Sequence, residues 1–404
     1  MTHEIVADCE VFKNLVLIGA QDLDGSNRIE IEIRDRATPE QIELMHRVFK
    51  NSTSYWFNWV GYDSLICAGV LAGFDTADVH RLSKDIITSG KRSWEVRNDH
   101  GLTVIKDWPA VDLMNFAARG SLKKYSARMG RDVQDFVFDP DADVLDDQMA
   151  AVRHYLFEGD LNATANLRMR LNPEIDARMA LGQVTGVDGL MQVNDAKAGE
   201  RVILAKYCER TGVEVAEVKA AAARNRGRKF RFALPKWVRD GVRGTGAEAP
   251  AKAMHGCWIQ PCPTTGRLKV EEGLWPAEFD IDGVITTLGF GGLHSVDPAG
   301  NLSQTKVVDA ASMYPHLLLG EGGAPDHLIE SEFHSIYRGI LDQRLAAKKA
   351  GDKRTANALK LALNSVYGKL GDIYSSLYSP QAQLRCTAAG QLSLITVSTT
   401  KSEK

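Results

Sequence analysis

Two short segments near the C-terminal end constrain most strongly what this chain can fold into. In the first, the apolar run Lys306-Val-Val-Asp309 is typical of a strand that ends at a carboxylate, and a turn that carries Tyr314 follows it. In the second, the pattern predicts a helix on which Lys360, Asn364 and Tyr367 share one face, because they stand at i, i+4 and i+7. The sequence therefore predicts a metal-binding carboxylate that faces a helix with a cation and an aromatic ring.

Length and composition bound the possible classes of protein. A chain of 404 residues is too long for one compact core and predicts two or three domains. The formal net charge of -3 gives no overall sign of nucleic-acid binding, but residues 219–243 and 344–369 are locally basic. Such runs are typical both of a solvated surface and of a phosphate-binding stripe. The six cysteines have no disulfide-framework or zinc spacing, and no signal peptide or membrane-spanning run is present, so we expect a reduced, cytoplasmic protein with no membrane partner.

The periodicity predicts an α/β fold in the N-terminal part. Residues 4–34 are expected to form strands around an Asp24-Gly25 turn, and Thr38-Pro39 opens a helix that runs to Lys50. We expect a first domain over residues 1–170, a connecting helical and irregular region over 171–275, and a third part over 276–404. Within the connecting region, residues 241–250 are the best linker candidate. In the third part, strands are expected at 279–288 and 306–309, and helices at about 329–350 and 353–367.

Acidic residues recur at the ends of the predicted elements of the first domain. Asp8 and Glu10 stand two apart on the first strand, so both side chains project from the same face. Asp63 follows a strand and begins a helix, and Asp160 lies at the start of a helix or within one. Paired acids on one strand face repel each other unless cations neutralise them. Two-metal phosphodiester cleavage needs about four such oxygen donors around two divalent ions.

Together these motifs resemble those of the family B, phage-type DNA polymerases. The C-terminal segments Asp309-Ala-Ala-Ser-Met-Tyr-Pro315 and Lys360-Leu-Ala-Leu-Asn-Ser-Val-Tyr-Gly-Lys369 are similar to the family's first palm motif and its fingers motif. The acidic residues are similar, in the same order, to the family's Asp-x-Glu, Asn-x-x-Gly-Tyr-Asp and Tyr-x-x-x-Asp exonuclease motifs. The resemblance implies an RNase H-like 3′–5′ exonuclease domain over residues 1–170, followed by a partial palm and helical-hairpin fingers over 276–404.

One residue departs from the exonuclease motifs. Tyr155 lies five residues before Asp160, where the family has four, so Leu156 occupies the position of the family's tyrosine. The sequence therefore indicates that the tyrosine that orients the attacking water is displaced.

The resemblance also implies roles for individual residues. It makes Asp8, Glu10, Asp63, Asp160 and Asp309 catalytic, with two Mg²⁺ ions (or Mn²⁺) in each active site held by Asp8, Glu10 and Asp160 or by Asp309. The residues implied to bind the incoming nucleotide are Tyr314, Arg344, Lys348, Lys360, Asn364 and Tyr367. Those implied to contact DNA are Asn58, Gly368 and Lys369.

The family's next palm motif, Tyr-x-Asp-Thr-Asp, does not follow before Lys404. We therefore expect an N-terminal portion of a polymerase that acts on primer-template DNA, single-stranded 3′ ends and deoxynucleoside triphosphates. A second polypeptide would supply the remaining palm and thumb. The resemblance further implies a phage protein in the cytoplasm of its host. Two alternatives remain open, namely a stand-alone RNase H-like 3′–5′ exonuclease and a non-catalytic DNA-binding remnant of a split polymerase.

Overall fold

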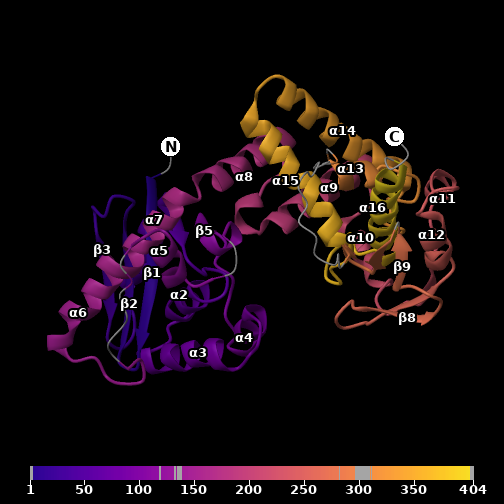
Figure 1. Ribbon diagram of the computed structural model, residues 1–404. Coiled ribbons are helices and arrows are strands. Elements are labelled where there is room, and N and C mark those ends of the chain that lie inside the picture. Colours follow the sequence, from indigo (N-terminus) through magenta and orange to yellow (C-terminus); the bar gives the residue numbers. More distant parts are fainter. Residues whose placement is uncertain are drawn as a thin grey trace. The chain divides into compact units, whose positions relative to one another are not determined.

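The chain has a mixed α/β structure that divides into two compact units (Figure 1). The computed structural model describes residues 3–117, 120–131, 133, 139–281, 283–295, 310 and 312–400. Unit 1 comprises Met1–Met179 with Met191–Asn194, and unit 2 comprises Ala180–Leu190 with Asp195–Lys404. Unit 2 thus includes most of residues 171–275, the region that the sequence suggested as a connection.

Unit 1 is built on a five-stranded mixed sheet with the order β3-β2-β1-β4-β5. Strands β1 to β3 are antiparallel neighbours, whereas β4 and β5 run parallel to β1. The strands are β1 (His3–Phe12), β2 (Leu15–Asp22), β3 (Ile29–Ile33), β4 (Ser52–Trp56) and β5 (Ala110–Asp112). The predicted strands of residues 4–34 are confirmed, and Gly25 adopts the positive φ of 85° that the turn between β2 and β3 requires.

Helices cover the sheet of unit 1 and bury a hydrophobic core on each of its faces. The predicted helix after Thr38 is confirmed as α1, with Thr38 as its capping residue. The helices are α1 (Pro39–Asn51), α2 (Asp63–Leu71), α3 (Thr76–Thr88), α4 (Ser93–Asp99), η1 (Leu113–Asn115), α5 (Leu122–Arg128), η2 (Asp146–Gln148), α6 (Met149–His154), η3 (Tyr155–Leu161), α7 (Asn162–Arg170) and α8 (Asn172–Thr185), the last of which is divided between the two units. Val6 and Phe12 on β1 pack into the same core as η3 and α7. Side chains alternate between the two faces of a strand, so Asp8 and Glu10 lie on the same face of β1 as Val6 and Phe12. The residues between them pack into the core on the opposite face.

Unit 2 combines two three-stranded antiparallel sheets with long helices. Its strands are β6 (Phe230–Arg231), β7 (Trp258–Pro261), β8 (Leu268–Glu272), β9 (Ala277–Ile281), β10 (Val284–Leu288) and β11 (Leu293–Ser295). Its helices are α9 (Asp195–Thr211), α10 (Val215–Ala223), α11 (Lys236–Gly241), α12 (Glu248–Met254), α13 (Met313–Leu318), α14 (Glu330–Lys349), α15 (Lys353–Leu370) and α16 (Pro380–Thr400), and the short η4 (Leu190–Gln192) joins the two units in sequence. The two helices predicted at about 329–350 and 353–367 are confirmed as α14 and α15.

Two expectations for unit 2 are wrong. Residues 241–250 are not a linker, because Val242 and Ala247 are buried in the core of unit 2 and α12 begins at Glu248. The single strand expected over 279–288 is a hairpin instead, in which β9 and β10 pair on either side of Gly283 at a φ of 83°. The strand expected at 306–309 lies outside the described residues. None of the helices in the described part of the chain combines the length and apolar character that a membrane span needs.

Candidate functional site

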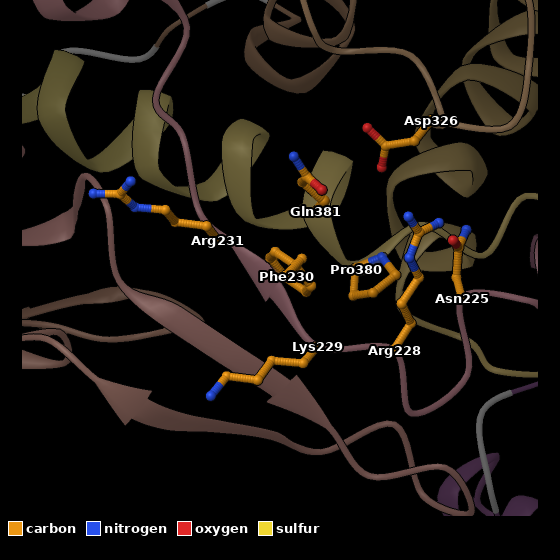
Figure 2. A pocket seen from close by; sticks show the side chains of 8 residues that line it. All are labelled: Asn225, Arg228, Lys229, Phe230, Arg231, Asp326, Pro380 and Gln381. Carbon is orange, nitrogen blue, oxygen red and sulfur yellow. The ribbon is translucent and has the colours of Figure 1, made fainter.

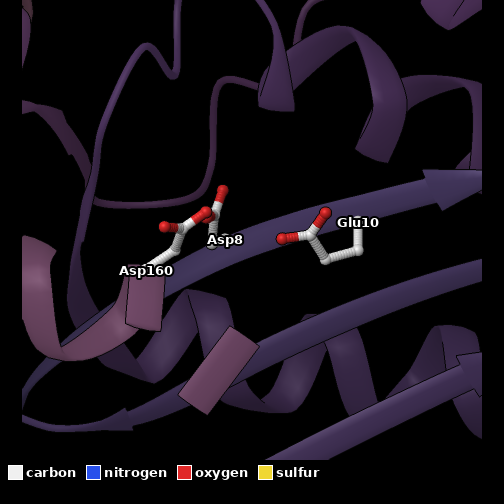
Figure 3. Close-up of side chains that lie close together, drawn as sticks. All are labelled: Asp8, Glu10 and Asp160. Carbon is white, nitrogen blue, oxygen red and sulfur yellow. The ribbon is translucent and has the colours of Figure 1, made fainter. Parts of the chain in front are cut away.

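Three carboxylates converge on one side of the sheet in unit 1. Asp8 and Glu10 project from β1, and Asp160 reaches them from η3 (Figure 3). One oxygen atom from each of the three side chains lies within 4.8 Å of the others. All three side chains are half-buried, which leaves them accessible to a small ion or a substrate. The structure thus brings Asp160 to Glu10, which lies 150 residues before it in the sequence, and to the neighbouring Asp8.

Asp63 extends this cluster from a different element. It is the first residue of α2, its side chain is 1% exposed, and it shares a side-chain hydrogen bond with Asp8. Two carboxyl groups can share such a bond only when one of them carries a proton. The Oδ1 atom of Asp63 is buried and has no hydrogen-bond partner. A cation bound next to this unsatisfied carboxylate oxygen would stabilise it together with the three neighbouring acids.

The position of Tyr155 corrects the sequence-based expectation. Tyr155, and not Leu156, is hydrogen-bonded to Asp160. The reason is that residues Tyr155–Leu161 form a π-helical turn, in which i→i+5 hydrogen bonding brings residues five apart onto the same side. Leu156 is fully buried against the sheet. The extra residue between tyrosine and aspartate is therefore absorbed by the backbone, and the tyrosine is not displaced.

A glycine on β2 allows this turn to lie close to the sheet. Gly19 pairs with Asp8 across the two strands. A Cβ atom at position 19 would lie 2.6 Å from Cδ2 of Leu156 and 3.3 Å from Cδ1 of Leu161. Both leucines are fully buried and have little room to move. The absence of a side chain at Gly19 thus sets the depth at which η3 presents Asp160.

An open pocket of about 510 Å³ lies over the acidic cluster. Its lining combines Asp8, Asp63 and Asp160 with the apolar side chains of Phe57, Met114 and Leu122. Such a lining suits a ligand that has a charged end and a flat apolar end. Lys123, from α5, also lines the pocket and acts electrostatically on both Glu10 and Asp160. Nothing in the local sequence ties Lys123 to acids more than thirty residues away, so no signal in the sequence could have found this interaction.

The electrostatics of the cluster favour a bound cation. Burial, followed by repulsion from Asp63 and Asp160, raises the pKa of Asp8 well above its usual value. Burial likewise raises the pKa of Glu10, of Asp63 and, less strongly, of Asp160, where the Tyr155 hydroxyl and Lys123 oppose the rise. Hard divalent cations prefer carboxylate oxygens, so Asp8, Glu10 and Asp160 fit Mg²⁺ or Mn²⁺, with Asp63 beside them.

Asn58 is held at the edge of the same pocket by a strained turn. It has a positive φ of 72°, which is uncommon for a residue other than glycine. Asp112 stabilises this turn, since its carboxylate accepts hydrogen bonds from the backbone N–H of Asn58 at 3.1 Å and of Val60 at 2.9 Å. The glycine at position 61 leaves room for the Asn58 side chain, because a Cβ atom there would lie 2.1 Å from its Oδ1 atom. This turn thus places Asn58 in the lining of the pocket.

In unit 2, two of the distant C-terminal motifs meet. Tyr314 of α13 stacks on Tyr367 of α15, with ring centroids 4.3 Å apart and 25° between the planes. Arg344 of α14 donates a hydrogen bond of 2.7 Å to the hydroxyl of Ser312. The hydroxyls of Tyr367 and Thr387 are hydrogen-bonded at 2.7 Å. The first and second segments are therefore joined by the aromatic stack, and the hydrogen bond from Arg344 ties the first segment to α14.

The remaining sequence-predicted residues of unit 2 are placed less tightly. Lys348, Lys360, Asn364 and Gly368 are exposed on α14 and α15. Lys369 is engaged within the unit, because its ammonium group lies 2.7 Å from Asp372 and 3.9 Å from the fully buried Glu200. Asp309 lies outside the described residues.

A scan against models of known protein families finds no matching family, and a search of curated proteins finds no significant match. The assignment of a function therefore rests on the residues and geometry of this chain.

Proposed function

We propose that unit 1 is a metal-dependent 3′–5′ exonuclease that acts on single-stranded DNA ends. The observation that carries the proposal is the convergence of Asp8, Glu10 and Asp160 within 4.8 Å, with Asp63 hydrogen-bonded to Asp8. Four carboxylates from three separate elements are costly to bring together without cations, since like charges in a partly buried site repel strongly. Two-metal phosphodiester hydrolysis is the reaction that such a cluster serves best.

The topology of unit 1 supports an RNase H-like fold. Three antiparallel strands in the order β3-β2-β1 are followed by two parallel strands, β4 and β5. This is the arrangement that we expect for the exonuclease domain of a family B polymerase, which the ordered acidic motifs resemble. The acids lie on the central strand β1 and on the helices that flank it, where a substrate has access to the sheet face.

Mg²⁺ or Mn²⁺ would supply an activated water and would stabilise the leaving oxygen. Asp8, Glu10 and Asp160 would hold the ions, and their protons would leave when the ions bind, since the pKa of each is raised in the metal-free protein. Tyr155 donates a hydrogen bond to Asp160 and thereby fixes the orientation of that carboxylate. Lys123 places a positive charge where the scissile phosphate would lie, and Phe57 and Leu122 offer apolar surface to the terminal base.

For unit 2 we propose a part of the nucleotide site of a family B DNA polymerase. The stack of Tyr314 on Tyr367 supports it, because it joins the two motifs that the resemblance assigns to palm and fingers. The hydrogen bond from Arg344 to Ser312 also ties α14 to the first of these motifs. Lys348, Lys360 and Asn364 would approach the triphosphate from the exposed faces of α14 and α15. A stand-alone nuclease would have no use for this pairing of motifs, which is why the polymerase assignment is preferred.

The exonuclease proposal is tested with a 5′-labelled single-stranded oligodeoxynucleotide and the purified full-length chain in Mg²⁺. The wild-type protein should shorten the labelled strand from its 3′ end in single-nucleotide steps, and EDTA should stop this digestion. The double variant Asp8→Asn/Glu10→Gln, which preserves side-chain volume, should lose the activity to the limit of detection while unfolding as cooperatively as the wild type.

Glu30 and Glu32 on β3 provide a matched control. They have the same spacing as Asp8 and Glu10 on another strand of the sheet, but both pair with Arg153, at 2.8 and 2.7 Å. The variant Glu30→Gln/Glu32→Gln should digest at the wild-type rate. Equal activity in wild type and the Asp8→Asn/Glu10→Gln variant would show that the acidic cluster is not the nuclease site and that any digestion comes from a contaminant.

A further inference from the structure

Unit 2 contains a second pocket, which the proposed function does not use. It has a volume of about 470 Å³ and lies between β6 with the turn before it and the first residues of α16 (Figure 2). Its polar lining consists of Asn225, Arg228, Lys229, Arg231, Asp326 and Gln381. Phe230 and Pro380 complete it. Three cations thus line the pocket against a single carboxylate.

The positive charge of this pocket is not neutralised within the protein. Residues 224–231 carry Arg224, Arg226, Arg228, Lys229 and Arg231 and no acid. In the part of the chain that the structure describes, Arg228, Lys229 and Arg231 are exposed and form no ion pair.

Asp326, the pocket's single carboxylate, is already engaged elsewhere. It accepts hydrogen bonds from Arg385 at 3.0 Å and from the Ser379 hydroxyl at 2.6 Å. Its charge is therefore balanced by Arg385 and does not offset the three pocket cations. Like charges crowded along one short segment repel each other, so an anionic ligand would stabilise the segment.

Two exposed aromatic rings lie next to cations of the basic segment 224–231. The Lys229 ammonium lies 5.2 Å from the centre of the Trp258 ring, which is 36% exposed. The Arg226 guanidinium lies 5.5 Å from the centre of the Tyr374 ring, which is 51% exposed. Exposed aromatic rings next to cations are the combination on which unpaired bases stack while their phosphates are held by charge.

The three cations are spread along the segment and do not converge on one point. In Figure 2, Lys229 and Arg231 extend to one side of β6, whereas Arg228 points toward the side of Asn225 and Asp326. A free triphosphate would need its cations focused on one point, but successive phosphates of a polynucleotide match cations that are spread along a strand.

From this geometry we propose that Arg228, Lys229 and Arg231, with Trp258 beside Lys229 and Tyr374 beside Arg226, bind the phosphate backbone of a single-stranded nucleic acid. The site is separate from the acidic cluster of unit 1 and from the Tyr314–Tyr367 contact. It does not rest on the proposed exonuclease activity, because every residue that forms it belongs to unit 2.

The test is fluorescence anisotropy of the full-length chain with a labelled oligothymidylate of about 12 nucleotides. EDTA is present throughout, so the probe stays intact whatever unit 1 does. The triple variant Arg228→Gln/Lys229→Gln/Arg231→Gln should bind at least about tenfold more weakly than wild type. The slope of log K against log salt should become shallower by about 2, which is ~0.7 for each of three lost phosphate contacts.

The control variant Lys219→Gln/Lys236→Gln/Arg239→Gln removes the same charge from exposed positions in the same basic region of unit 2. It should leave the salt slope unchanged. A second variant, Trp258→Ala, should weaken binding while leaving the slope unchanged, which separates stacking from charge. Near-equal losses in the test and control triples would overturn the proposal. So would displacement of the probe by deoxythymidine triphosphate at an equal phosphate concentration, which would indicate a site for free nucleotide.

Discussion

Replacing Gly19 on β2 by alanine should disturb the acidic site by displacing η3, the turn that carries Asp160. The new Cβ atom would lie 2.6 Å from Cδ2 and 3.0 Å from Cγ of Leu156, and 3.3 Å from Cδ1 of Leu161. Ordinary contacts between carbon atoms are about 3.5–4.0 Å, so η3 has to move outward by several tenths of an ångström or more. Overpacking of this kind costs about 1–3 kcal/mol in the free energy of unfolding.

The same movement should be measured more sensitively through activity. Asp160 and Tyr155 lie on the displaced turn, and a misplacement of ~1 Å in a catalytic group can lower a rate about 10²-fold. The experiment compares urea unfolding and 3′-end digestion for wild type, Gly19→Ala, Leu156→Ala and the double variant. In the Leu156→Ala background the two closest atoms are gone, so Gly19→Ala should cost less than it does alone.

A control at Gly339 in α14 separates close packing from the change of residue type. No heavy atom lies within 4 Å of a Cβ atom built at Gly339, so Gly339→Ala should stabilise the protein by about 0.5–1 kcal/mol. If Gly19→Ala leaves stability and digestion unchanged, or if its cost is the same with and without Leu156, the close approach of η3 to the sheet does not position Asp160.

Further outcomes follow from the same site and from unit 2. Tyr155→Phe removes the hydroxyl that donates to Asp160 and should slow single-turnover digestion about 10- to 100-fold without loss of fold. The pKa values of Asp8 and Asp63 are raised in the folded protein, so above about pH 4 the folded state holds these protons while the unfolded chain has lost them. In EDTA, thermal stability should therefore fall as pH rises above about 4. Asp63→Asn should weaken that pH dependence and raise stability at neutral pH, and Mg²⁺ should stabilise the wild type more than this variant. In unit 2, Tyr367→Phe loses the hydrogen bond to Thr387 and should cost about 1 kcal/mol in urea unfolding.

The parts of the fold that follow from local patterns were predictable from the sequence. Alternation along the first strand places Asp8 and Glu10 on one face, and the capping residue Thr38 marks the start of α1. The long amphipathic helices α14 and α15 were predictable for the same reason, since their apolar residues recur at helical spacing.

What the sequence did not reveal depends on contacts between distant segments. The place of Tyr155 was misjudged because the prediction rested on the residue spacing of the family motif, whereas the chain forms a π-helical turn there. Burial of Leu156 and Leu161 against Gly19 fits that turn to the sheet. The region 241–250 was taken for a linker because small residues suit both a flexible chain and tight packing, and here Ala247 packs in the core. Lys123 was not recognised because its relation to Glu10 and Asp160 exists only in three dimensions.

The most direct test of the account is to locate the metal ions. Crystals of the full-length chain grown with Mn²⁺ and thymidine monophosphate would be measured by anomalous diffraction at the manganese edge. The account predicts two peaks about 3.5–4 Å apart, both within bonding distance of the carboxylates of Asp8, Glu10 and Asp160, with the nucleotide phosphate against them. Absence of manganese from these three carboxylates while the ion occupies other sites would contradict it.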